Sequence, residues 1–132
     1  MATSVWGASG KNLWITNTLG VINKNMNLQP PPPGAPGMFR CAGDGLIRSL
    51  MEKSGFKNIK EQEVNGKLVY EDFEHMWQMM NEVAAPVVAA LSKATDEMRQ
   101  KIRNEVQQNS QQYQTSKGLE LDYGALVISG AK

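Results

Sequence analysis

Residues Gly124-Ala-Leu-Val-Ile-Ser129 form the stretch that decides the fold class. Four of its residues are consecutive and apolar, and the run ends at Gly130. Such a run is typical of a strand buried on both faces, whereas a half-buried strand alternates in polarity. We therefore expect a sheet with this strand in its interior and helices around it, which is an α/β domain, or α+β if the sheet is small.

Other strands are expected at both ends and in the middle of the chain. Ala2–Trp6 is rich in Thr, Ser and Val and ends at Gly7, which favours a strand. Lys57–Val64 alternates weakly, and Asn65-Gly66 then predicts a tight hairpin with a returning strand at Lys67–Tyr70. The alternation of Leu119–Asp122 predicts a second hairpin, with the last strand as its partner.

Four or five helices are expected from apolar residues at helical spacing and from capping residues. They are Asn12–Met26, Gly45–Ser54 capped by Asp44 and closed by Gly55, a region that opens at Asp72 and breaks or kinks at Pro86, another that starts with Val87–Leu91, and a helix capped by Thr95. Methionine and tryptophan crowd the third region at Met76, Trp77, Met79 and Met80. Core packing explains that cluster, and the alternative is an adaptable pocket wall.

Composition excludes several classes of protein. The chain has 132 residues, 41% hydrophobic and 20% charged, which suits one domain over residues 1–132. Its net charge of +1 and scattered basic residues give no surface for nucleic acid. No apolar stretch is long enough to span a bilayer, and the amino terminus does not resemble a signal peptide. We expect a cytoplasmic protein.

Chemical motifs are few. Gly43-Asp44-Gly45 is explained by a turn before a helix, because Arg48 replaces the third glycine of a dinucleotide-binding loop. His75 is the sole histidine and Cys41 the sole cysteine, so no metal site is expected. No residue stands out as a catalytic base, and the catalytic residues stay unassigned.

Residues 29–37, QPPPPGAPG, form a proline-rich loop. Consecutive prolines exclude a helix interior or a central strand and favour extended polyproline II geometry. The loop is either a disordered linker or a stiff segment that lies across a surface; the apolar residues Met38 and Phe39 follow it at once.

The run KNLWITNTLGVINKNMNLQPPPPGAPGMFRCAGDGLIRSLMEKSGFKNI resembles the second half of bacterial class I methyltransferases of the ubiquinone and menaquinone biosynthesis group. VNGKLVYEDFEHMWQMMNEVAAPVVAAL and ALVISGAK are similar to the same group. The resemblance implies a sheet of order 3-2-1-4-5-7-6 with an antiparallel last strand. Here it implies a small mixed sheet of about three strands in order 5-7-6, formed by Ala2–Trp6, Ala125–Ser129 and the Lys57–Val64 region. Residues 72–114 would be a helical insertion.

The resemblance also implies a function, transfer of a methyl group from S-adenosylmethionine to a small-molecule acceptor. The family's glycine-rich loop and ribose-binding acidic residue match nothing in this sequence, so no donor-binding residue is carried over and the isolated chain is expected to be inactive. The acceptor side is present, since ligands of open α/β sheets bind beyond the carboxyl ends of strands. Candidates to line the acceptor pocket are Trp6, Trp14, Met38, Phe39, Arg40 and Trp77.

Three hypotheses follow for the whole chain. The first is a methyltransferase fragment or split subunit that needs an amino-terminal half as its partner. The second is a stand-alone ligand-binding or homodimerising module, with Ala2–Trp6 as a bare strand edge that pairs with a second copy. The third is a truncated reading frame without independent activity.

Overall fold

The computed structural model describes residues 1–29, 31–32 and 34–132. Pro30 and Pro33 of the predicted proline-rich loop lie outside the described residues. Contacts group the chain into two compact units. The first holds residues 1–12, 31–32, 34–66 and 122–132, and the second holds residues 13–29 and 67–121.

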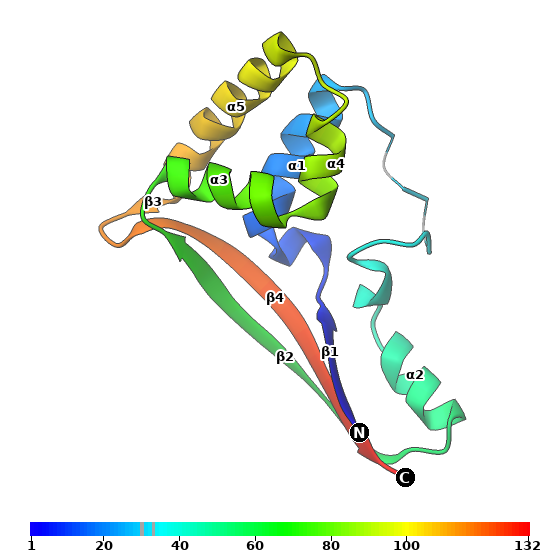
Figure 1. The fold of residues 1–132 in the computed structure, drawn as a ribbon. Coiled ribbons are helices and arrows are strands. Elements are labelled where there is room, and N and C mark those ends of the chain that lie inside the picture. Colours follow the sequence, from blue (N-terminus) through cyan, green and yellow to red (C-terminus); the bar gives the residue numbers. More distant parts are fainter. Residues whose placement is uncertain (30, 33) are drawn as a thin grey trace. The chain divides into compact units, whose positions relative to one another are not determined.

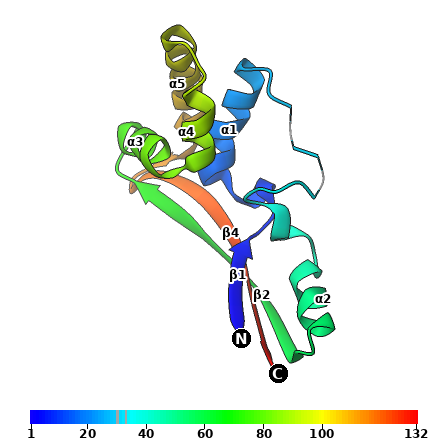
Figure 2. The ribbon, with the colours of Figure 1, turned by 45° about the vertical axis from the view of Figure 1, so that its right-hand side comes forward.

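The described strands form one antiparallel sheet (Figures 1 and 2). They are β1 (Ala2–Trp6), β2 (Lys57–Tyr70), β3 (Gln114–Thr115) and β4 (Gly118–Ala131). The order is β1-β4-β2, with β3 paired to β4, so the last strand does lie between the first and the second. The prediction of a mixed sheet is wrong, because β4 is antiparallel to its neighbours and no parallel pair forms among the described strands.

Strand β1 pairs with β4 from one end to the other, with Ala2 opposite Ser129 and Trp6 opposite Ala125. Beyond the strand ends, Gly7 N donates to Gly124 O at 2.8 Å. Met1 N donates to Gly130 O at 2.8 Å, and Gly130 N donates to Met1 O at 2.9 Å. These bonds fix which residues of β1 exchange hydrogen bonds with β4.

The hairpin predicted at Asn65-Gly66 is wrong, since β2 runs without a turn through both residues. Gly66 has a different role there. A Cβ added at Gly66 would come within 2.7 Å of the ring of Tyr123, so the glycine lets that ring lie against the strand. Glycine within a strand often marks a close approach of this kind.

The apolar run in β4 is not buried on both faces, which corrects that prediction. Ile128 is fully buried, but the side chain of its neighbour Val127 is 38% exposed. Opposite Val127, Ser4 of β1 is exposed as well. One face of the sheet in the first unit is therefore partly open to solvent.

Helix α2 (Leu46–Lys53) packs in the first unit through Met51, which is 4% exposed. A Cβ at Gly130 would come within 3.1 Å of the Met51 and Ile59 side chains, so the glycine lets α2 approach β4. Gly55 closes the helix with φ +82°, as predicted. The predicted cap at Asp44 is wrong, because the capping position belongs to Gly45 and no side chain caps it.

The second unit holds most of the described helices: α1 (Leu13–Asn25), α3 (Phe73–Val83), α4 (Ala85–Leu91), α5 (Asp96–Ser110) and a short 3-10 turn at Gln111–Tyr113. Helix α1 packs on α5 and α4, and α3 packs on α4. The predicted cap at Thr95 is confirmed, since Thr95 Oγ1 accepts from Met98 N at 3.2 Å. Asp72, predicted to open its helical region, also caps it: Asp72 Oδ1 accepts from His75 N at 2.9 Å.

The core of the second unit follows the helical spacing of the sequence. Its fully or nearly fully buried apolar residues are Ile15, Val21, Ile22, Met76, Met80, Val87, Leu91, Ile102, Val106, Leu119 and Leu121. Met76 and Met80 are 0% and 2% exposed, so two members of the methionine cluster belong to this core.

The final hairpin lies earlier in the chain than predicted. Gln114 pairs with Leu119, so the turn falls at residues 116–117, and residues 119–122 are the start of β4. Gly118 follows the turn with φ +121°, and a Cβ there would lie 2.2 Å from the Tyr70 carbonyl oxygen. The position of the turn is set by Gly118, which has no room for a side chain, whereas the prediction relied on the alternation of polar and apolar residues.

Candidate functional site

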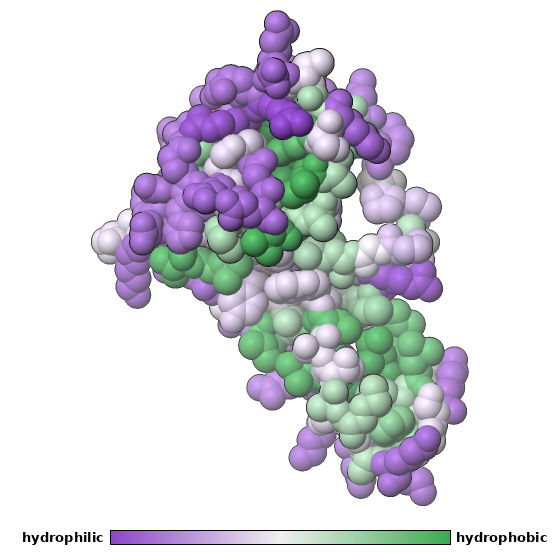
Figure 3. All heavy atoms as spheres, in the orientation of Figure 1, coloured by the Kyte–Doolittle hydropathy of each residue, from purple (hydrophilic) through white to green (hydrophobic). Residues whose placement is uncertain are grey.

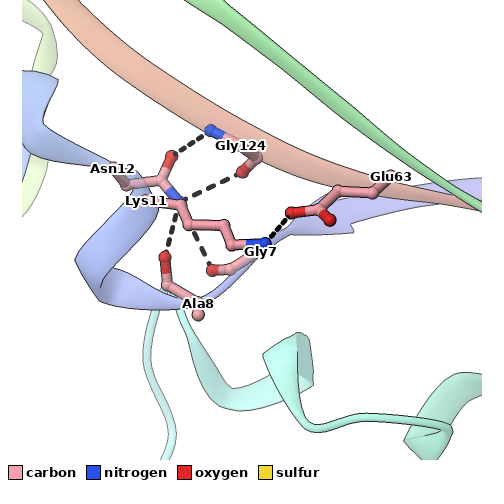
Figure 4. A network of polar contacts seen from close by, with 6 residues as sticks. All are labelled: Gly7, Ala8, Lys11, Asn12, Glu63 and Gly124. Carbon is pink, nitrogen blue, oxygen red and sulfur yellow. Dashed lines mark hydrogen bonds and ion pairs between the residues drawn. The ribbon is translucent and has the colours of Figure 1, made fainter.

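The buried side chain of Asn12 links the segment that follows β1 to β4 (Figure 4). Its Oδ1 accepts from Gly124 N at 3.2 Å, and its Nδ2 donates to Gly124 O at 3.1 Å. The same Nδ2 donates to Ala8 O at 3.0 Å and lies 3.4 Å from Gly7 O. Asn12 is 0% exposed, so these bonds replace those that water would supply.

An ion pair borders this network. Lys11, in the short 3-10 turn Ser9–Lys11, donates to Glu63 of β2. The hydrogen bond from Lys11 holds the pKa of the Glu63 carboxyl below its usual value, with the ammonium charge adding to the effect. Gly124 allows Lys11 and Asn65 to lie close to β4, since a Cβ at this position would lie 3.0 Å from Lys11 Cβ and 2.9 Å from Asn65 Oδ1. The segment that follows β1 is thus bonded to β4 through Asn12 and to β2 through an exposed ion pair.

A small cavity of about 220 Å³ lies in the proline-rich segment of the first unit. Its described lining is Pro31, Pro32, Gly34, Ala35, Pro36, Gly37, Phe39 and Arg40. Arg40 donates through Nη1 to Gly34 O, which ties the segment to the 3-10 turn Arg40–Ala42. That turn in turn contacts β1.

The structure therefore brings two predicted site residues, Phe39 and Arg40, to one cavity. Met38 is half-buried and does not line it among the described residues. Trp6, also half-buried, ends β1 in the same unit.

The remaining predicted site residues, Trp14 and Trp77, belong to the second unit. Trp77 is half-buried and stacks on Phe73, with ring centroids 6.1 Å apart and planes 20° apart. The Arg103 guanidinium lies 5.4 Å from the centroid of the Phe73 ring and pairs with Glu74. The Trp77 ring is thus engaged within its own unit.

The described lining of the first-unit cavity is apolar apart from Arg40. Among residues 1–29, 31–32 and 34–132, no group of three or more His, Cys, Asp or Glu side chains could hold a metal ion. His75 is exposed, and its Nδ1 accepts from Glu71 N at 3.3 Å. Prolines, an aromatic ring and a guanidinium can hold an apolar molecule and donate hydrogen bonds to it.

Sequence reasoning missed the role of Asn12, which it placed only at a helix start. An asparagine that follows a strand and a turn is a weak signal, since the same residue type caps helices. Its partner Gly124 is 112 residues away, so the pairing becomes visible only once β4 lies beside β1.

No helix in the described part of the chain is long and apolar enough to cross a membrane.

Comparisons with known proteins add no assignment. The sequence matches no protein-family profile and no curated protein.

Proposed function

We propose that this chain is the acceptor-binding part of an S-adenosylmethionine-dependent methyltransferase, with the donor-binding residues supplied from outside these 132 residues. One support is the strand order β1-β4-β2. The resemblance implies this arrangement for the fifth, seventh and sixth strands of the family. An antiparallel sheet is not itself a methyltransferase core, whose central strands are parallel, so the proposal requires those strands from elsewhere.

The second support is the position of the candidate acceptor residues. Phe39 and Arg40 line the cavity of the proline-rich segment, and the turn that begins at Arg40 contacts β1. Trp6 marks the carboxyl end of that strand, which is where an open sheet binds ligands once it includes the parallel strands that the proposal requires. The Phe39 ring and the Arg40 guanidinium line the same cavity, so the acceptor that fits it best is apolar and carries an anionic or hydrogen-bond-accepting group.

Positioning would be the main catalytic contribution of this chain. Holding an acceptor in line with a methyl donor turns a bimolecular step into an effectively unimolecular one. The rigid anchoring of the β1 end by Asn12 serves that purpose, because it fixes the strand end from which Trp6 projects.

Two titrations test the proposal. S-adenosylmethionine titrated into the chain in a calorimeter should give no saturable binding up to about 1 mM, and micromolar binding would overturn the division between donor and acceptor sides. An apolar aromatic anion, 1-anilinonaphthalene-8-sulfonate, should bind with a rise in its fluorescence.

Variants then locate the binding of the aromatic anion. Phe39→Ala and Arg40→Gln should each weaken binding about threefold or more, since each removes one kind of contact. Arg99→Gln is the matched control, because Arg99 is an exposed arginine on α5 in the other unit. If all three variants bound the aromatic anion with equal affinity, the proposed acceptor role of this cavity would be wrong.

A further inference from the structure

Strand β1 has an outer edge that carries hydrogen-bonding groups of the backbone. It ends the strand order, with β4 on one side only among the described strands. Antiparallel ladders alternate between pairs that exchange hydrogen bonds and pairs that do not. Met1–Gly130 exchanges bonds, so the bonding positions of β1 are odd-numbered. The N–H and C=O groups of Ala2 and Ser4 therefore point away from β4.

Nothing in the sequence of β1 protects that edge. Natural edge strands are usually guarded by charged residues, proline, bulges or a covering element. The strand Ala-Thr-Ser-Val-Trp carries neither a charge nor a proline, and its pairing with β4 has no bulge. An uncharged, regular edge is a template for the addition of another strand.

An apolar groove runs beside the same strand. A cavity of about 290 Å³ lies between β1 and α2, lined by Met1, Thr3, Ile47, Leu50, Met51, Ser54 and Phe56. Leu50, which lines this groove, is 51% exposed, and Leu46 of the same helix is 39% exposed. Figure 3 shows apolar surface over α2 and beside β1. A strand added to the β1 edge would cover part of this surface as it makes its hydrogen bonds.

We infer that β1 pairs with β1 of a second copy of this chain in an antiparallel, two-fold symmetric manner. The occupant must be an extended segment with outward N–H and C=O groups in matching positions, and β1 of a second copy offers these at Ala2 and Ser4. With Ser4 opposite Ser4 of the second copy, each N–H donates to the other's C=O. A two-fold axis perpendicular to the sheet keeps both α2 helices on one face, so the Leu50 side chains of the two copies flank the same seam.

This inference does not rest on the proposed function, since it uses only the β1 edge and the α2 groove. The donor half of that proposal would take the same edge of β1, so the dimer is the state of the chain by itself. It is tested by sedimentation velocity on the 132-residue chain over a concentration series. Ser4→Pro removes the outward N–H and is tolerated at an edge, because that N–H does not bond to β4. Ser4→Ala is its matched control, since it keeps the N–H. Leu50→Lys places a charge in the groove, and Val83→Lys does the same at an exposed valine of α3.

The expected result is a concentration-dependent dimer in the parent chain, in Ser4→Ala and in Val83→Lys. Ser4→Pro and Leu50→Lys should weaken dimerisation about tenfold or more, with circular dichroism showing an unchanged fold. A monomer throughout the series overturns the inference, and so does a dimer that Ser4→Pro and Leu50→Lys leave intact. If Ser4→Pro unfolds, the comparison of dimerisation between Leu50→Lys and Val83→Lys tests the inference, and equal dimerisation in the two variants overturns it.

Discussion

Replacement of Asn12 by alanine should destabilise the first unit more than the loss of one hydrogen bond would. Two of the three carbonyl partners keep another donor, since Gly124 O accepts from Gly7 N and Ala8 O accepts from Lys11 N. Gly124 N has its described partner in Asn12 Oδ1 and would be left buried without one. An orphaned buried N–H costs about 1–3 kcal/mol, and the truncated side chain leaves a void worth about 1 kcal/mol more.

The total is about 2–4 kcal/mol in the free energy of unfolding. Urea denaturation followed by circular dichroism measures it, and hydrogen exchange at the Gly124 amide locates it. Asn17→Ala, on helix α1 of the second unit, is the matched control, because Asn17 Nδ2 makes one described bond, to Ser110 Oγ at 2.9 Å. That variant should cost about 1 kcal/mol.

A cost for Asn12→Ala no larger than that for Asn17→Ala would refute this reasoning. Asn12→Asp adds a second check, because it keeps the shape but turns acceptor oxygens toward three carbonyls. It should be less stable than the parent at neutral pH and should recover as the pH falls, since protonation restores one donor.

Three further changes have defined outcomes. Gly118→Ala should cost about 2–4 kcal/mol in thermal unfolding, because the φ of +121° strains alanine and its Cβ would lie 2.2 Å from Tyr70 O; an unchanged melting temperature would contradict the turn geometry. Thr18→Val should stabilise the chain by about 1 kcal/mol in urea, since Thr18 is 0% exposed and its Oγ1 lacks a partner in the described residues; destabilisation would reveal a bond to that oxygen. Glu63→Gln should lower stability at neutral pH and lose its effect as the pH falls below 4.5: Lys11 lowers the folded pKa of Glu63, so the contribution is present above the ordinary value and vanishes as the folded form is protonated. A constant difference between parent and Glu63→Gln from neutral to acid pH would show that the charge is not involved.

Local patterns predicted the parts of the fold that depend on neighbours in sequence. Met76 and Met80, four residues apart, face the core of the second unit as their spacing indicated. Thr95 caps its helix as predicted, and the helical region does open at Asp72, because a capping bond reaches only three residues along the chain. The place of the last strand inside the sheet also followed from its sequence.

Features that depend on distant partners escaped prediction. Asn65-Gly66 is a strong hairpin signal, but Gly66 is present to accommodate the Tyr123 ring from another strand. The apolar run that ends at Ser129 predicted a strand buried on both faces, yet Val127 is 38% exposed. Burial of a sheet face depends on which distant elements cover it, and the run itself carries no information about them.

The candidate site was predicted only in part for the same reason. Phe39 and Arg40 share a cavity because they adjoin in sequence. Trp14 is only two residues from Asn12, but the boundary between the two units falls between Asn12 and Leu13, so Trp14 belongs to the second unit. Sequence proximity carries no information about such a boundary.

The central claim is that this chain supplies the acceptor side of a methyltransferase and lacks the donor side. Its most direct test is a calorimetric titration of S-adenosylmethionine into three samples: the chain, a donor half that comprises the first four strands of a ubiquinone/menaquinone-group methyltransferase, and their equimolar mixture. We predict saturable micromolar binding in the mixture, weaker or no binding by the donor half, and none by the chain. Binding by the chain alone, or a mixture that behaves as the donor half does by itself, would contradict the account.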